Sequence, residues 1–576
     1  MPEFRSVVPC PPIPADLTAA QFILDSYHPK RPIRPGNVPW LIEDSTGRKV
    51  EYEEIRLRTH ALANALHLRW GVGENDVVCV FSPNHVDYPV SMWAAHRLGA
   101  TVSCANPSYT ADELVHQLIT TKAFVMVSHP DSLPTALAAA RQAGLAADHI
   151  FLMDELKAKT PIPYPTISDL VKEGLSQPTS FKERRLAPGE GKTKLAFLSF
   201  SSGTTGKPKA VAIPHYAVIA NVVQMAEYHK VNEDYTIWEK RRFRPGDIAV
   251  AVLPFFHIYG LVVNLHWLLF SGITIVVIPR FNFLDFLKSI DRYKIQHLLL
   301  VPPQVVLLCK HPAVKKYDLS HVRFCISGAA PLSRELTQQL IKVLPNAQIG
   351  QGYGMTETCT TVTMVPITQW IGTPGSGGQL IPGCTARVVK ADGTLADYDE
   401  EGELHVTGPQ MALRYTNDEK ATQETFVDGW VRTGDEVKFA RNGDIFIVDR
   451  LKEILKVRGF QVAPAELEGH LLDHPDVSDA CVVGIPDDYS GEVPLAFVML
   501  ETRAAERAKR SNAEAEKIKQ SIMKHVSDAK VQYKWLKGGI EFVDVIPKNP
   551  SGKLLRRLMR DKAKEIVAKR GAKAKL

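Results

Sequence analysis

A chain of 576 residues exceeds the usual size of one domain, and its composition, 45% hydrophobic and 23% charged, is typical of a globular enzyme. These values exclude a disordered chain, a collagen-like chain and a small disulfide scaffold. The formal net charge is +6, but residues 553 to 576 carry ten Lys and Arg against two acidic residues, so the rest of the chain is slightly acidic. We therefore expect no nucleic-acid partner.

Short β-branched segments alternate with amphipathic helical segments along most of the chain. Strands are predicted at 77 to 81, 124 to 128, 297 to 301 and 324 to 327. The predicted helices are residues 86 to 98 and a segment that begins at an N-cap, Ser333, and stops at Pro345. This order predicts an α/β fold with parallel sheets covered by helices.

Two central segments depart from this alternation. Residues 227 to 246 have neither the helical nor the strand period, and we expect a surface insertion with a solvated charge run. The stretch between Asp247 and Arg280 has no Asp, Glu, Lys or Arg, and could cross a bilayer of ~30 Å. Pro254 and several polar residues interrupt it, so we expect a buried strand, a loop, a short helix and a strand at 273 to 278, and no membrane span.

The pattern changes to an α+β unit near the C-terminus. After a strand at 445 to 449, Pro464 can open a helix that carries apolar residues on one face, namely Leu467, Leu471 and Leu472. The further expected elements are strands at 480 to 485 and 495 to 500, a helix from Asn512 to Ser527, and a strand at 540 to 545. The unit spans residues 453 to 576 and is long enough for its own core.

The cysteines and the N-terminus indicate a reducing compartment. The eight cysteines show no CxxC spacing and are expected to be free thiols. Glu3 and several prolines stand where a signal peptide would have its apolar core, so secretion is not expected.

The segment LSFSSGTTGKPKAV, residues 198 to 211, contains the residue types that bind polyphosphate. Glycines let backbone N–H groups approach an anion, hydroxyls donate hydrogen bonds and lysines supply charge. It is not a Walker A loop, because two residues rather than four separate its glycines and Pro208 follows the lysine. A glycine-rich turn without a ligand is the alternative. The candidate residues are Ser201, Ser202, Gly203, Thr204, Thr205, Gly206, Lys207 and Lys209.

Two further segments suit a nucleotide. In QIGQGYGMTET, residues 348 to 358, a glycine-rich backbone with one aromatic side chain suits a purine or ribose, and Thr356 beside Glu357 suits Mg²⁺. In GWVRTGDE, residues 429 to 436, Asp435 could accept both hydroxyls of a ribose. A tight turn and a turn aspartate are the alternatives.

Together with IPKNPSGK, residues 546 to 553, these segments resemble the adenylate-forming superfamily of acyl-CoA synthetases, luciferases and carrier-loading adenylation domains. Within it the chain is most similar to the 4-coumarate-CoA ligase group, through NPSYT, LPFFHIYG, SGAAPL, QGYGMTE and VDRLKEILKVRGFQVAPAELE. The resemblance implies an N-terminal domain, residues 1 to 449, of stacked, helix-covered sheets with a small β-barrel-like subdomain. A hinge at 450 to 452 and a mobile α+β lid at 453 to 576 follow.

The same resemblance implies an ATP-dependent acid–CoA ligase. The acid attacks the α-phosphate of MgATP to give an acyl-AMP, and the thiolate of CoA then displaces AMP. The loop at 201 to 209 would hold the β- and γ-phosphates, Glu357 would bind Mg²⁺ and Thr356 would contact the α-phosphate. The remaining nucleotide contacts would be Gln351, Gly352 and Tyr353 at the adenine, Asp435 and Arg450 at the ribose, and Lys452 at the hinge. The residues implied in catalysis are Lys553, which would reach the phosphates when the lid is closed, His257, Lys456 and Gln461.

The CoA and acyl sites follow from the resemblance too. CoA contacts would be Arg280, Arg458 and Gly459, and the acyl pocket would involve Tyr259, Val263, Ala329 and Met364. Arg458 stands where plant ligases usually have Lys, Lys207 where they usually have an apolar residue, and Val263 where a hydroxycinnamate ligase would have a small polar residue. We therefore expect no selectivity for 4-coumarate, and a largely apolar pocket floored by Ala329 that takes phenylacetate, cinnamates or a medium-chain fatty acid.

Two alternatives to the ligase remain open. One is an adenylating enzyme with another acceptor, either a carrier protein or, as in luciferases, oxygen. The other is a nucleotide-binding scaffold without activity, which the presence of Lys553, Glu357 and Asp435 disfavours. The chain ends in Ala574-Lys575-Leu576, a variant of the Ser-Lys-Leu signal, so we expect a peroxisomal location and the peroxisomal import receptor as a partner.

Overall fold

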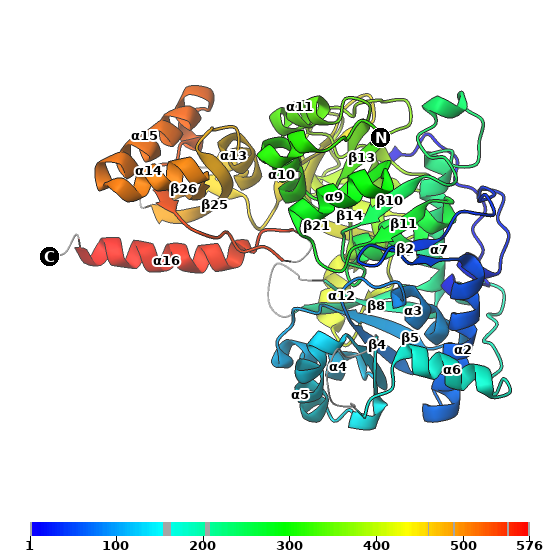
Figure 1. The fold of residues 1–576 in the computed structure, drawn as a ribbon. Helices are drawn as coiled ribbons and strands as arrows, with labels where there is room; N and C mark the ends of the chain where they lie inside the picture. Colours follow the sequence, from blue (N-terminus) through cyan, green and yellow to red (C-terminus); the bar gives the residue numbers. More distant parts are fainter. Residues whose placement is uncertain are drawn as a thin grey trace.

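The computed structural model describes residues 3 to 153, 163 to 201, 208 to 458, 460 to 487, 490 to 549 and 552 to 573. It confirms the predicted α/β class, with a large N-terminal part and a small C-terminal part (Figure 1). Within the described residues, three sheets belong to the large part and one to the small part. The C-terminal part lies beside α10 (Pro302–Lys310) and α11 (Arg334–Val343).

The first sheet has seven strands in the order β19-β9-β8-β5-β4-β6-β7. The strands from β8 to β7 run parallel, and the predicted strand at 77 to 81 is β4, buried throughout as expected where both faces are covered. The bounds are β4 Val77–Phe81, β5 Thr101–Ala105, β6 Val125–Ser128, β7 Ile150–Leu152, β8 Leu195–Ser201, β9 Lys209–Pro214 and β19 Arg414–Tyr415. The helices in this part are α2 Tyr52–Trp70, α3 Tyr88–Arg97, α4 Ala111–Thr121, α5 Leu133–Ala143 and α6 Ile167–Ser176.

The second sheet has nine strands in the order β16-β15-β14-β13-β12-β10-β11-β2-β3, parallel from β14 to β2. The predicted helix after Ser333 is α11, and the Ser333 hydroxyl accepts a hydrogen bond from Leu336 N as an N-cap. The bounds are β2 Leu41–Glu43, β3 Lys49–Val50, β10 Ile248–Ala251, β11 Thr274–Val277, β12 His297–Leu300, β13 Phe324–Ser327, β14 Gln348–Met355, β15 Thr360–Met364 and β16 Gln379–Leu380. Helix α7 (His215–Tyr228) precedes β10 in the chain, and α9 (Phe283–Tyr293) lies between β11 and β12.

The charge-free stretch forms the buried elements that the sequence predicts. It contains β10, a π-helix (Tyr259–Trp267), the short α8 (Leu268–Phe270) and β11. The π-helix packs against α7, and the largest buried cluster joins both to the two large sheets. No helix within the described residues is long and apolar enough to cross a membrane. A π-helix is rare and often marks a functional site, because its extra residue per turn redirects side chains.

The prediction of a solvated insertion at 227 to 246 holds at its centre, where residues 232 to 240 are exposed or partly exposed, but is wrong towards both ends. Tyr228 still belongs to α7, and Arg242 and Phe243 are buried. The Arg242 guanidinium donates to Gln348 Oε1 at 2.7 Å and to the carbonyls of Val365, Pro366 and Gln369 at 3.0 Å. A buried guanidinium is tolerated because its donors are satisfied by these acceptors. The sequence indicated a solvent-exposed Arg242 only because this residue is charged and lies in a charged run.

The third sheet is antiparallel and stands where the small barrel-like subdomain is expected. Its order is β1-β17-β18-β21-β20, with β22 also paired to β21, and within the described residues no pairing joins β1 to β20 or β22. The bounds are β1 Phe4–Arg5, β17 Thr385–Val389, β18 Gly402–Thr407, β20 Phe426–Val427, β21 Trp430–Phe439 and β22 Ile445–Arg450. Helix α12 (Glu419–Thr425) packs beside β21.

The C-terminal part has a five-stranded sheet with its own buried cluster. Helix α13 (Pro464–Leu471) begins at Pro464 and buries Leu467 and Leu471, as predicted, whereas Leu472 caps its end and is only partly buried. The strands are β23 Leu455–Val457, β24 Phe460–Val462, β25 Val477–Asp487, β26 Gly491–Leu500 and β27 Gly539–Phe542. The other helices are α14 Thr502–Arg510, which the sequence analysis missed, α15 Asn512–Ala529 and the basic α16 Arg556–Lys573.

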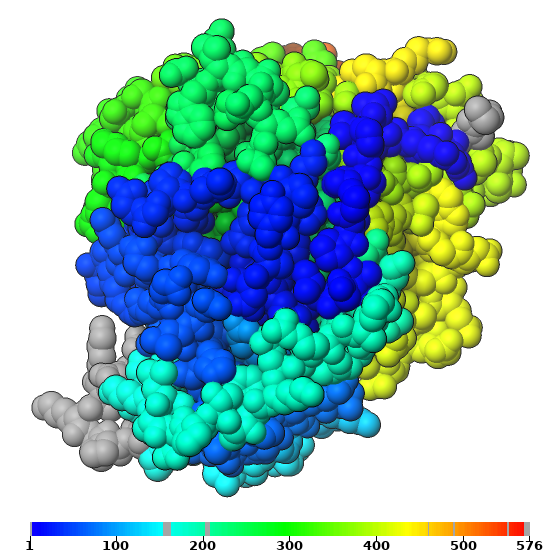
Figure 2. Space-filling model, turned by 90° about the vertical axis from the view of Figure 1, so that its right-hand side faces the viewer, coloured from blue at the N-terminus to red at the C-terminus, as the bar shows by residue number. Residues whose placement is uncertain are grey.

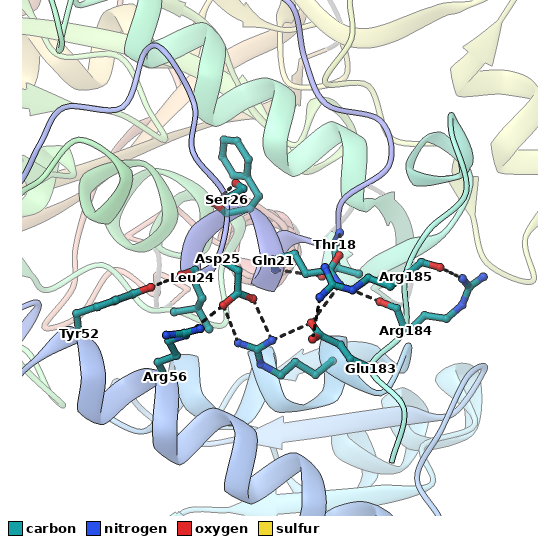
Figure 3. A network of polar contacts seen from close by, with 12 residues as sticks. Thr18, Gln21, Leu24, Asp25, Ser26, Tyr52, Arg56, Glu183, Arg184 and Arg185 are labelled. Atoms are coloured by element: carbon teal, nitrogen blue, oxygen red, sulfur yellow. Dashed lines mark hydrogen bonds and ion pairs between the residues drawn. The ribbon is translucent and has the colours of Figure 1, made fainter. Parts of the chain in front are cut away.

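The N-terminal segment crosses one face of the large part (Figure 2). A polar network anchors α1 (Ala19–Leu24) there (Figure 3). Arg97 pairs with Asp25 at 3.0 Å and with Glu183 at 2.8 Å, and Gln21 donates to Glu183 at 3.0 Å. The network therefore holds α1, α3 and the segment before β8 together. All eight cysteines are free, as predicted.

Candidate active site

The predicted nucleotide residues lie at the carboxyl end of β14, which forms a hairpin with β15. Gly354 is required there, because a Cβ on this residue would lie 1.5 Å from the carbonyl oxygen of Thr360. QGYGMTE is therefore a strand followed by a short 3₁₀ turn at Thr356–Thr358, not merely a tight turn. The Gln351 amide bonds the backbone of Leu332 at 2.7 and 3.4 Å, which holds the SGAAPL loop beside this strand.

Tyr353, Asp435 and Arg450 meet at the junction of β14 and the third sheet. The Tyr353 hydroxyl donates to Asp435 Oδ2 at 2.6 Å, and Arg450 Nε lies 3.1 Å from Asp435 Oδ1. Asp435 and Arg450 are cross-strand partners on β21 and β22, so Asp435 is a strand residue rather than a turn residue. Burial, followed by the charge of Asp435, raises the pKa of Tyr353. The phenol therefore stays protonated and fixes one carboxylate oxygen.

Glu357 is buried in the 3₁₀ turn that follows β14, and its carboxylate is the group predicted to bind a divalent cation. Its Oε1 accepts a hydrogen bond of 2.7 Å from the Tyr415 hydroxyl, and no described residue donates to Oε2. Lys209 Nζ lies 5.1 Å from the centre of the Tyr415 ring, so the described end of the phosphate loop reaches the same place. Within the described residues no group of three His, Cys, Asp or Glu side chains could hold a metal. A single carboxylate fits Mg²⁺, which proteins usually hold through one or two carboxylates plus substrate phosphates.

Lys553 enters this site from the C-terminal part. It lies close enough to Arg450, Asp435, Glu453 and Glu357 for their charges to act on it. The turn before it is closed by Lys553 N donating to Asn549 Oδ1 and by Asn549 N donating to the Lys553 carbonyl, both at 2.8 Å.

Gly552 explains the glycine of the PKNPSGK motif. A Cβ on Gly552, whose φ is +80°, would lie 2.8 Å from Val301 Cγ2 of the large part. The absent side chain therefore lets the turn that carries Lys553 approach the large part.

His257 and Tyr259 face the same region from the start of the π-helix. Burial, followed by the charge of Lys553, lowers the pKa of His257 to about 4. His257 is therefore neutral at physiological pH, and its Nδ1 accepts from Tyr259 N at 3.3 Å. The Tyr259 ring lies against Gly328, where a Cβ would be only 3.0 Å from the ring. The histidine can thus line a pocket without adding a charge that would compete with Lys553.

The four predicted acyl-pocket residues differ in exposure. Val263 and Met364 are buried, Tyr259 is partly buried, and Ala329 is exposed with a φ of +69°. Met364 is the cross-strand partner of Gly352, so it lies beside the nucleotide strand.

Two residues that the sequence did not single out, His229 and Arg242, hold the Met364 side chain in place. His229 Nε2 lies 3.4 Å from Met364 Sδ, while His229 Nδ1 lies 3.2 Å from Arg242. His229 lies in a run of polar residues without a helical or strand period, so the sequence did not indicate that it contacts Met364.

The described residues predicted to bind CoA and to act in thioester formation do not lie near Lys553. Lys456, Arg458 and Gln461 are exposed on the hairpin of β23 and β24, and Lys452 is exposed in the turn after β22. With its amide turned to satisfy both groups, Gln461 donates to Glu436 at 2.7 and 3.0 Å. Arg280 is exposed and pairs with Asp131 at 3.1 Å. The lid is therefore placed with Lys553 towards the large part, whereas Lys456 and Arg458 are exposed and Gln461 contacts β21.

Several predicted residues lie outside the described residues. Of the residues predicted to bind phosphate in the loop at 201 to 209, Ser201 and Lys209 are described. The other candidates of that loop, Gly459 and the terminal tripeptide are not.

The lowered pKa of Lys553 predicts that the rate of adenylation falls at alkaline pH. Burial, followed by the charge of Arg450, lowers this pKa to about 8, so the ammonium is lost as the pH rises through this value. Since kcat/KM reports the free enzyme, we expect kcat/KM for acyl-AMP formation to fall above about pH 8. Thioester formation from supplied acyl-AMP should lack this limb. The measurement is a pH profile of each half-reaction, and in Lys553→Arg, which stays protonated, the limb should disappear. A limb that persists in the arginine variant would assign the titration to another group.

The chain is similar to known proteins over nearly its whole length. Residues 31 to 416 match the family described as AMP-binding enzyme, and residues 466 to 553 match the AMP-binding enzyme C-terminal domain. A protein named 4-coumarate--CoA ligase 2 from Oryza sativa subsp. japonica is 37% identical over 97% of this chain and 95% of its own length. An acyl-CoA ligase from Alternaria alternata is 35% identical over 96% of each chain. The crystal structure of an anthranilate CoA ligase in complex with anthranoyl-AMP has a similar fold, with a TM-score of 0.81, 23% identity, and coverage of 96% of this chain and 99% of that one.

Proposed function

This chain belongs to the AMP-binding enzyme family, and we propose that it is an AMP-forming acid–CoA ligase that works through an acyl-adenylate. The reaction converts a carboxylic acid, ATP and CoA to acyl-CoA, AMP and pyrophosphate. The observation that carries the proposal is that the buried ammonium of Lys553 lies within electrostatic range of Arg450, Asp435 and Glu357, and also of His257, which is neutral. One cation is thereby held where the α-phosphate of ATP would become more negative during attack by the acid.

Each residue of the site has a separate role in the adenylation step. Asp435, oriented by Tyr353 and Arg450, accepts the ribose hydroxyls. Lys553 holds its ammonium toward the phosphate oxygens as the carboxylate oxygen bonds to the α-phosphorus and pyrophosphate leaves. Glu357 would hold Mg²⁺, which supplies positive charge to the ATP phosphates. In the second step the CoA thiolate attacks the acyl carbonyl and AMP leaves, and we assign this step to Lys456 and Gln461 after the lid has turned.

The acid is proposed to be of the aryl type, such as a cinnamate, 4-coumarate or phenylacetate, or a medium-chain fatty acid. Val263 and Met364 are apolar and buried, and the His229 ring contacts Met364. Apolar pockets discriminate similar acids weakly, so several acids should react. The decisive test is CoA-dependent AMP release over a panel of aryl and aliphatic acids. The ligase proposal predicts activity with at least one apolar acid. AMP formation without thioester would instead favour an adenylating enzyme with another acceptor, and absence of ATP–pyrophosphate exchange would contradict an adenylating enzyme.

A peroxisomal location is also proposed, from the terminal Ala574-Lys575-Leu576. Helix α16, which ends at Lys573 just before this tripeptide in the sequence, extends away from the large part (Figure 1). We expect a fluorescent protein fused to the N-terminus, with the C-terminus free, to accumulate in peroxisomes. Deletion of Leu576 is the matched control and should leave the fusion in the cytosol. A cytosolic fusion with the intact C-terminus would contradict the proposal.

A further inference from the structure

Lys310, the last residue of α10, crosses from the large part to the lid. Its Nζ donates to the carbonyls of Leu472 and Val477, each at 2.8 Å. Leu472 caps the C-terminal end of α13, and Val477 begins β25. One side chain of the large domain therefore holds the backbone of the lid at two points. Figure 1 shows α10 and α13 side by side at this contact.

The chemistry of the contact favours a cation. The last carbonyls of a helix lack partners within the helix and carry the negative end of its dipole, so an ammonium at the end of α13 is stabilising. Burial lowers the pKa of Lys310, and the carboxylates of Glu501 and Asp473 on the lid oppose this effect. An ammonium with three donors satisfies both carbonyls, while an uncharged side chain of the same length would satisfy neither.

The surrounding interface is close-packed in this orientation. A Cβ on Gly469 of α13 would lie 3.3 Å from Ser333 Cβ, at the N-cap of α11. Burial, followed by the charge of Glu335 on α11, raises the pKa of Asp473 to about 6. The contact is thus partly closed to water, which makes the hydrogen bonds of Lys310 stronger than they would be on an open surface.

We propose that Lys310 is a positioning residue for adenylation. By holding the carbonyls of Leu472 and Val477 it keeps the lid in the orientation in which Lys553 reaches the nucleotide site. It must release both carbonyls when the lid turns for thioester formation. Lys310 touches no substrate in this scheme, and it acts through Lys553. The inference rests on the proposed ligase function, because only a two-step reaction requires the lid to have two orientations.

The test compares Lys310→Met, Lys310→Arg and, as a matched control, Lys316→Met, which removes an exposed lysine nearby in the chain. ATP–pyrophosphate exchange measures adenylation, and thioester formation from supplied acyl-AMP measures the second step. We expect Lys310→Met to slow adenylation roughly tenfold, equivalent to ~1.4 kcal/mol, without slowing the second step. Arginine should restore most of the adenylation rate, and the control should behave as the wild type.

Three results would overturn the proposal. These are an adenylation rate in Lys310→Met equal to the wild type, equal loss in both half-reactions, and failure of arginine to restore the rate. Trypsin cleavage at the exposed Lys452 gives a readout that needs no activity. Release of the lid should make this cleavage several-fold faster in Lys310→Met than in Lys316→Met, and equal rates would also contradict the proposal. If the wild type forms no acyl-AMP, the ligase function fails, and the cleavage rates still decide whether Lys310 holds the lid.

Discussion

Replacement of Lys553 by alanine is expected to reduce acyl-AMP formation by roughly 10³-fold, the upper range for removal of one group that stabilises charge in a transition state. The ammonium lies within electrostatic range of Arg450, Asp435 and Glu357, around the place that the α-phosphate would occupy. Thioester formation from supplied acyl-AMP should be nearly unchanged, because the hairpin that carries Lys456 and Gln461 does not contain Lys553. The measurement is the rate of each half-reaction.

The matched variant for the second step is Gly459→Trp. Gly459 lies outside the described residues, but it stands between Arg458 and Phe460, whose side chains are exposed on the lid. A large side chain there should obstruct the approach of CoA and spare adenylation. Opposite losses in the two variants are expected from a lid that presents two faces in turn. Equal losses in both steps for both variants would indicate one fixed active site and would leave the ligase function itself intact.

Glu357→Gln should lower adenylation and the reverse pyrophosphorolysis together, by about 10²-fold. The amide has the shape of the carboxylate and can still accept from the Tyr415 hydroxyl, but it lacks the negative charge that Mg²⁺ prefers. The effect should be largest at limiting Mg²⁺. The measurement is ATP–pyrophosphate exchange in both directions over a Mg²⁺ titration.

Tyr415→Phe separates the metal role from a purely structural one. It removes the hydroxyl that orients Glu357 and keeps the charge and the ring over which Lys209 lies. We expect a much smaller loss, on the order of tenfold, with the Mg²⁺ requirement nearly unchanged. Wild-type rates for Glu357→Gln at limiting Mg²⁺ would contradict the metal role.

The sequence predicted most elements of the large part and of the lid, because a strand buried on both faces is a short apolar run and a helix buried on one face has a helical period. The strands at 77 to 81 and 324 to 327 and the helix after Ser333 are found where the pattern placed them. The motifs also identified side chains that the fold brings together, among them Tyr353, Asp435 and Lys553. These residues are recognisable because the chemistry of a nucleotide site restricts both residue type and spacing.

Other residues could not be predicted, because nothing local distinguishes them. Arg242 lies in a charged run that looks solvated, and only the folded chain provides the buried carbonyls that it binds. Tyr415 is a single aromatic residue without a period, and Lys310 ends a helix as many surface lysines do. In each case the partner lies far away in the sequence.

The sequence by itself thus determined the class of fold, the order of its elements and the residue types of a nucleotide site. Only the tertiary structure decided which of these residues share one site, that Lys553 rather than Lys456 faces it, and that Lys310 holds the lid there. The physical reason is the range of the interactions involved. Periodicity and capping act over a few residues, whereas the orientation of the lid depends on contacts between α10 and the C-terminal part, which are separated by more than a hundred residues.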